Sequence, residues 1–84
     1  MKIYYHPQFF KSYKFLDKKI KEKAETKEKI FRENHFHNSL KTHKLSGKLK
    51  NQWSFSVDNK YRIIFEFING DVVFLDIGTH KIYQ

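Results

Sequence analysis

The spacing of hydrophobic residues changes once along the chain, from a helical period in the first half to alternation in the second. Apolar side chains first recur every three or four positions, which is the spacing of one helical face. These positions are Phe9, Tyr13, Leu16, Ile20 and Ala24. Lysine occupies most of the opposite face. We expect a break near Thr26 or shortly before it, followed by a second helix that ends in ENHFHNS, so that the two helices form a hairpin.

A short strand is predicted at KIYY, because His6-Pro7 follows it and proline suits the first turn of a helix. The segment LKTHKLSGKLKNQ has no clear period and predicts an exposed loop. Residues 53–57 then alternate between apolar side chains and serine, which is typical of a strand with one buried face. Two further strands, in YRIIFEFI and VVFLDI, flank Asn69-Gly70, a strong hairpin signal.

The length of the turn at Asp58-Asn59-Lys60 determines which side chains share a face of the sheet. A two-residue loop would place Arg62 among buried aromatic residues, where an unpaired guanidinium is costly. We therefore expect a three-residue loop. The face opposite the aromatic residues then holds Ser54, Ser56, Arg62 and Glu66. The predicted fold is a single α+β domain over residues 1–84, with an N-terminal strand and a helical hairpin packed on one side of a small antiparallel sheet.

Composition narrows the class of protein. The 84 residues contain no cysteine, which excludes a disulfide framework and a thiolate metal site. Aromatic residues make up 18% of the chain and supply a large apolar area for a short sequence. No apolar run approaches the roughly 20 residues of a membrane span, and the N-terminus lacks the hydrophobic region of a signal peptide. We expect a cytoplasmic protein without a membrane partner.

Positive charge is concentrated in the first half of the chain. The formal net charge is +8, and residues 1–50 hold 14 of the 17 Lys and Arg but 5 of the 9 acidic residues. Such a field favours a polyanionic partner, either a nucleic acid or an acidic protein segment. A solvated lysine-rich surface is the alternative interpretation.

The candidate chemistry depends on His, Arg, Lys and Tyr. His35 and His37 are a weak metal signal, because no cysteine assists them and helical residues two apart point in different directions, so we expect neither a metal nor a cofactor. No glycine-rich phosphate loop, nucleophile elbow or H-E-x-x-H motif occurs, which excludes most enzyme classes. The residues that remain suit RNA cleavage, because RNA supplies its own 2′-hydroxyl nucleophile.

Two segments, THKLSGKLKNQWSFSVDNKYRIIFEF and LDIGTHKIY, carry a specific resemblance. In order they contain an H-x-L-x-G loop, a W-x-F-x-V strand, a Y-R-I-I-F strand and a terminal G-T-H. This ordered set resembles the toxins of bacterial type II toxin–antitoxin pairs, the RelE/ParE superfamily, in particular its YafQ-like and RelE-like mRNA interferases. The resemblance implies a metal-independent endoribonuclease that cuts mRNA, often on the ribosome, and that a cognate acidic antitoxin neutralises.

The resemblance also implies roles for individual residues. Arg62 would stabilise the scissile phosphate, and Tyr83 would position or activate the 2′-hydroxyl. His43 and His80 match histidines that the YafQ-like branch uses in acid–base and phosphate roles, and which of them is the base stays open. The residues that would hold mRNA or rRNA phosphates are Lys44, Lys48 and Lys50.

The chain departs from the family pattern at the first strand after the loop. Ser54, Ser56 and Lys60 stand where the YafQ-like branch has further catalytic residues, and Trp53 and Phe55 stand where RelE has a lysine pair. Two other functions are therefore weighed beside the ribonuclease. One is a ParE-like inhibitor that binds DNA gyrase, and the other is a catalytically degenerate family member.

Each proposed site residue also has a structural interpretation. His43 could lie idle on a loop, Arg62 could pair with Glu66 on its own strand, His80 could be an idle chain-end residue, and Tyr83 could close the core.

The end of the last strand decides between a reactive cluster and a frayed chain end. Strict alternation along FLDIGTHKIYQ places His80 on the face opposite Arg62. Gly78 marks a point where the strand bulges or ends, so a bend there would bring His80 and Tyr83 to the face of Arg62.

Overall fold

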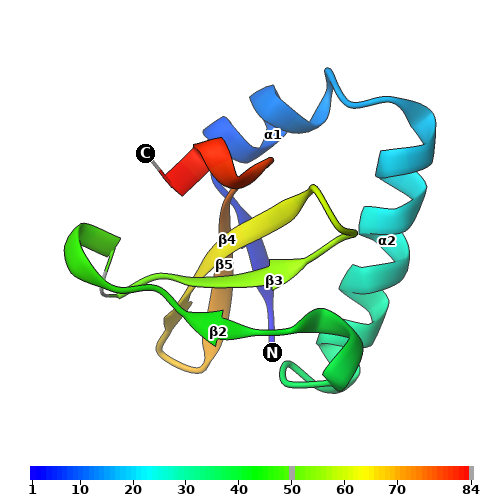
Figure 1. The fold of residues 1–84 in the computed structure, drawn as a ribbon. Coiled ribbons are helices and arrows are strands. Elements are labelled where there is room, and N and C mark those ends of the chain that lie inside the picture. The colour runs from blue at the N-terminus through cyan, green and yellow to red at the C-terminus, as the bar shows by residue number, and fades with distance from the viewer. Residues whose placement is uncertain (50, 84) are drawn as a thin grey trace.

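The computed structural model describes residues 1–49 and 51–83, which form two helices and a five-stranded sheet (Figure 1). The helices are α1 (Pro7–Tyr13) and α2 (Lys18–Glu33). The strands are β1 (Ile3–Tyr5), β2 (His43–Lys44), β3 (Trp53–Ser56), β4 (Arg62–Ile68) and β5 (Asp71–Gly78). Three short 3-10 helices complete the set: η1 (Asn38–Leu40), η2 (Gly47–Leu49) and η3 (His80–Tyr83).

The two helices form as predicted, but the break between them lies earlier in the chain. Helix α1 ends at Tyr13, and Asp17 caps α2 by accepting a hydrogen bond from the Ile20 amide at 3.0 Å. Thr26 lies inside α2, where its hydroxyl donates to the Glu22 carbonyl at 3.1 Å. The prediction of a break near Thr26 was wrong because an aspartate cap determines where the helix begins, and a threonine in the helix is tolerated.

The sheet has the strand order β1-β5-β4-β3-β2. Strand β1 pairs with β5 in parallel, and the other pairs are antiparallel. The α+β class is confirmed, but the sheet is mixed and not purely antiparallel as predicted. A turn signal in the sequence links only strands that are close in the chain. Strand β1 pairs with a strand some 70 residues away, as Tyr4 with Val73, so the sequence carries no sign of this pairing.

The β3–β4 register confirms the predicted three-residue loop. Phe55 pairs with Ile63 and Ser56 pairs with Arg62. The Asp58 carboxylate closes the loop by accepting from the Lys60 and Tyr61 amides at 2.9 and 2.8 Å. Arg62 consequently lies on the serine face of the sheet.

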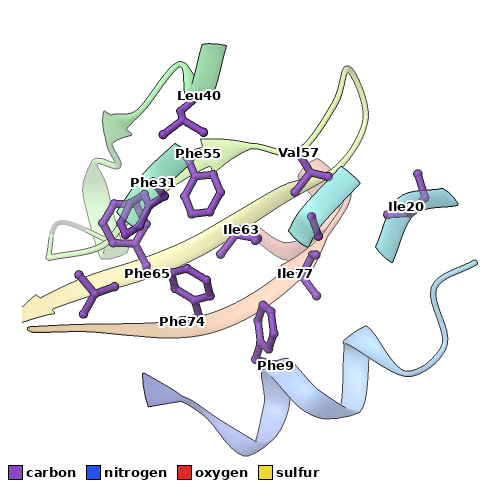
Figure 2. Close-up of a cluster of buried hydrophobic side chains, with 12 residues drawn as sticks. Phe9, Ile20, Phe31, Leu40, Phe55, Val57, Ile63, Phe65, Phe74 and Ile77 are labelled. Carbon is purple, nitrogen blue, oxygen red and sulfur yellow. The ribbon is translucent and has the colours of Figure 1, made fainter. Parts of the chain in front are cut away.

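Phe31 of α2 is the centre of the hydrophobic core (Figure 2). Its ring centroid lies 4.8 Å from that of Phe55 and 4.9 Å from that of Phe65, and its side chain is fully buried. Phe9 of α1 packs against Phe74 at 5.6 Å. The helices therefore cover the aromatic face of the sheet, and the serine face is left for the C-terminal turn.

Neither helix, among the described residues, is long and apolar enough to cross a bilayer.

Candidate functional site

Beyond β5 the chain turns back over the serine face of the sheet. The turn is η3, drawn in red in Figure 1, and its Ile82 amide donates to the Thr79 carbonyl at 3.0 Å. At its end the Tyr83 hydroxyl lies 2.7 Å from the Ser54 hydroxyl on β3. The last described residue of the chain is thus joined to strand β3.

Two features of β5 bring the turn to this face. The register between β4 and β5 shifts by one residue, because Ile64 pairs with Asp76 while Phe65 pairs with Phe74, and Leu75 is the extra residue. Beyond this bulge Gly78 pairs with Arg62, so the following residues leave the strand beside Arg62. Strict alternation would have put His80 on the opposite face, but β5 ends at Gly78, as one of the two alternatives in the sequence analysis expected, and the bulge lies earlier, at Leu75.

Gly78 also lets the turn lie close to the strand. A Cβ atom at this position would lie 2.5 Å from the Cγ2 atom of Ile82. Only glycine leaves room for Ile82, so the absent side chain allows η3 to pack against the end of β5.

Arg62 is half-buried, and its Nη1 atom donates to the Ser56 hydroxyl at 3.1 Å. The ion pairs within the described residues join Lys23 to Asp58 and Arg32 to Glu28. The alternative pairing of Arg62 with Glu66 is thus not found there. A guanidinium held by a neutral hydroxyl keeps its full charge available for an anion.

Arg62 and His80 line the same pocket, of about 320 Å³, together with Lys60, Thr79 and Lys81. Arg62 also lines a second hollow, of about 200 Å³, with Ser56 and two lysines. The lysines of that hollow are Lys27 and Lys41. Arg62 thus lines two hollows, each of which also holds lysines.

His43 lies on β2 directly opposite Ser54, and paired residues of an antiparallel ladder share a face. It therefore lies on the face of Tyr83, in the row of the sheet next to that of Arg62. Its Nδ1 atom is 3.0 Å from the Lys41 carbonyl, which can only accept a hydrogen bond, so Nδ1 carries the proton. In the neutral imidazole, Nε2 is then the atom that accepts a proton.

The lysines named from the sequence lie elsewhere or are not described. Lys44 pairs with Trp53, so alternation puts it on the opposite face from His43. The side chain of Lys48 and all of Lys50 lie outside the described part of the chain. Sequence reasoning missed the lysines that do surround Arg62, because Lys27 comes from α2 and Lys41 adopts a left-handed conformation, with φ of 49°, that its sequence does not signal. Of these lysines, Lys60 was the one that the sequence could have indicated, because it stands only two residues before Arg62.

Asp58 is the acidic residue of this region. Burial alone would raise the pKa of Asp58, but the amides of Tyr61 and Lys60 and the Lys23 ammonium lower the pKa overall. Its charge offsets part of the surrounding positive charge. No group of three His, Cys, Asp or Glu side chains that could hold a metal ion occurs within residues 1–49 and 51–83.

This fold and this sequence define a RelE-like toxin of a type II toxin–antitoxin system, and the chain belongs to that family. The model that matches it, over residues 5–80, is the HigB-like toxin, described as the RelE-like toxin of the type II system HigB. This match confirms the resemblance to the RelE/ParE superfamily.

Solved structures confirm the RelE-like fold. YafQ from E. coli strain BL21(DE3) has a TM-score of 0.81 at 22% identity, over 96% of this chain and 94% of that one. The YoeB/ParE toxin from Agrobacterium tumefaciens has a TM-score of 0.80 at 19% identity, over 95% and 99%. The YafQ chain of the E. coli DinJ–YafQ toxin–antitoxin complex has a TM-score of 0.77 at 24% identity, over 95% and 92%. No curated protein matches the chain.

Proposed function

We propose that this toxin is a metal-independent endoribonuclease that associates with the ribosome and cleaves mRNA there. The observation that supports it is the arrangement of His43, Arg62, His80 and Tyr83 on the sheet face opposite the core. A ParE-like gyrase inhibitor would act by protein binding and would not need this arrangement. A degenerate member would keep the fold without the activity.

The reaction is attack of the 2′-oxygen on the adjacent phosphorus. The bond from phosphorus to the 5′-oxygen breaks, and the products are a 2′,3′-cyclic phosphate and a 5′-hydroxyl. One group must take the proton of the 2′-hydroxyl and another must give a proton to the leaving oxygen. The negative charge that grows on the phosphorane oxygens must also be stabilised.

His43 and His80 supply the two proton transfers. His43 suits the general base, since its Nδ1 atom is occupied by the Lys41 carbonyl and its Nε2 atom accepts the proton. His80 then acts as the general acid from the pocket that it shares with Arg62. Tyr83, which ends η3, positions the 2′-hydroxyl from the same face as His43.

Arg62 stabilises the phosphorane. One of its N–H groups is engaged by Ser56, and the others are available to phosphate oxygens. Its lysine neighbours hold the phosphates on either side of the scissile bond. They are Lys27, Lys41, Lys60 and Lys81.

The second partner is an acidic antitoxin that folds on the basic surface of the toxin. Two observations support it: the net charge of +8, and the complex that the structurally similar E. coli YafQ forms with DinJ. We place the toxin and its partners in the cytoplasm. A small acidic protein encoded beside the toxin should bind it and restore growth to cells that express it.

The experiment compares tightly controlled expression of the wild type with His80→Ala, Arg62→Ala and the control Lys11→Ala, a lysine that lines neither hollow at Arg62. The wild type and Lys11→Ala should arrest growth and cleave mRNA, and the two site variants should do neither. Purified ribosomes programmed with labelled mRNA should yield fragments that end in a 2′,3′-cyclic phosphate. Growth arrest with intact mRNA and inhibited gyrase supercoiling would replace the proposal with the ParE-like function. Full toxicity of both site variants would overturn the assigned roles.

A further inference from the structure

We infer that Ser54 and Ser56 are positioning residues that hold Tyr83 and Arg62 in place for the reaction, an inference that rests on the proposed function. The serines stand two residues apart on β3 and point to the same face of the sheet. Each hydroxyl binds a different proposed catalytic residue.

Burial makes these contacts significant. Ser54 is 0% exposed and Ser56 is 7% exposed, and they are the buried polar residues of the described chain. A buried hydroxyl without a partner costs free energy, so a serine at such a site depends on the group that it binds. Within the described residues every buried side-chain nitrogen or oxygen has a hydrogen-bond partner. The side-chain hydrogen bonds of the two serines go to Tyr83 and Arg62.

Ser54 determines the position of the whole C-terminal turn. Two neighbouring contacts hold the C-terminal end of η3. Ile82 occupies the space of the missing side chain at Gly78, and the next residue, Tyr83, meets Ser54. Because His80 begins this four-residue turn, the contact with Ser54 also restricts where the His80 imidazole lies.

Ser56 orients Arg62 without neutralising it. The two residues are cross-strand partners, and the hydroxyl accepts from Nη1 at 3.1 Å. A carboxylate here would compete with the phosphate for the guanidinium, whereas a neutral hydroxyl restricts its orientation and leaves the charge for the substrate. The two serines of β3 therefore serve the site by holding Tyr83 and Arg62.

The test measures RNA cleavage by Ser54→Ala and Ser56→Ala. We expect kcat to fall about 10- to 100-fold for each, with KM changed less than about threefold, because small misplacements act on the transition state. Ser56→Thr, which keeps the hydroxyl, should recover most of the loss. The matched control is Thr26→Ala, which removes an exposed hydroxyl bonded to the Glu22 carbonyl at 3.1 Å on α2 and should retain wild-type kcat.

Double variants separate positioning from general stability. If Ser54 acts through Tyr83, Ser54→Ala should lower kcat no further in a Tyr83→Phe background, and Ser56→Ala should do nothing more in an Arg62→Ala background. Fully additive losses, or serine variants with wild-type kcat, would overturn the inference.

Amide hydrogen exchange at Ile82 gives a readout that does not need cleavage. Ser54→Ala should speed exchange of this amide, which donates to the Thr79 carbonyl, at least tenfold, while Thr26→Ala should not. If the wild type cleaves no RNA but exchange responds in this way, the proposed function fails and the anchoring of the turn stands. Unchanged exchange in Ser54→Ala would reject the anchoring even if the wild type is active.

Discussion

Arg62 pairs with Gly78 across β4 and β5, so the one arginine of the sheet lies beside the one residue of β5 that has no side chain. The pairing has two consequences. The guanidinium lies next to the point where the chain leaves β5, and the missing Cβ atom lets η3 return over the sheet. The arginine proposed to bind the phosphate therefore lies beside the turn that carries His80 and Tyr83, the two residues proposed to work with it.

Gly78→Ala should displace η3. The new Cβ atom would lie 2.5 Å from Ile82, a clash that the turn can relieve only by moving away from the strand. We expect RNA cleavage to fall at least tenfold, with a loss of about 1–3 kcal/mol in the free energy of unfolding. Cleavage rates and urea unfolding measure the two effects.

The control for this variant is Gly70→Ala. Gly70 has a φ of 86° in the β4–β5 turn, and a Cβ atom there would meet nothing within 4 Å. It should lose stability through backbone strain but keep full activity for each folded molecule. Wild-type cleavage by Gly78→Ala would show that the position of η3 does not matter for activity.

The sequence predicts the serine face and marks Gly78 as the residue where the last strand ends, but it does not predict the bulge at Leu75. The cost of burying an unpaired guanidinium was enough to predict the β3–β4 register, which depends on a local turn. The extra residue Leu75 and the packing of Ile82 on Gly78 depend on contacts between distant segments, for which single residues carry no signal. The placement of Lys41 could not be predicted either, because left-handed residues other than glycine are uncommon.

Arg62→Lys should behave as a damaging substitution although it keeps the positive charge. Arg62 donates to Ser56 and still presents planar N–H groups to a phosphate, whereas a lysine ammonium is a point charge without this fork. We expect kcat to fall about 10-fold or more, and Arg62→Ala to lose about 10²- to 10³-fold. Single-turnover cleavage of a short labelled RNA measures both. Arg32→Lys, which changes an arginine paired with Glu28 on α2, is the matched control and should be fully active.

Asp58 should make stability depend on pH in the acid range. Its folded pKa lies below the ordinary value of 3.8, so its ionised form stabilises the fold above that value and the contribution disappears as the pH falls through the folded pKa. Wild type should be more stable than Asp58→Asn above about pH 5, and the gap should close toward pH 2. Urea unfolding between pH 2 and pH 6 tests this. A gap that stays constant with pH would mean that Asp58 acts through loop geometry and not through its charge.

The lysines beside Arg62 should carry the salt dependence of RNA binding. Lys41 and Lys60 each line one of the two hollows that Arg62 also lines, whereas Lys11 and Lys18 line neither. Each phosphate contact adds roughly 0.7 to the slope of log affinity against log salt for single-stranded nucleic acid. Lys41→Gln with Lys60→Gln should therefore lower the slope by about 1.4, and Lys11→Gln with Lys18→Gln should leave it unchanged. Fluorescence anisotropy with a short RNA, in a His80→Ala background that does not cut it, separates binding from cleavage. Equal slopes in the two double variants would show that RNA does not follow these hollows.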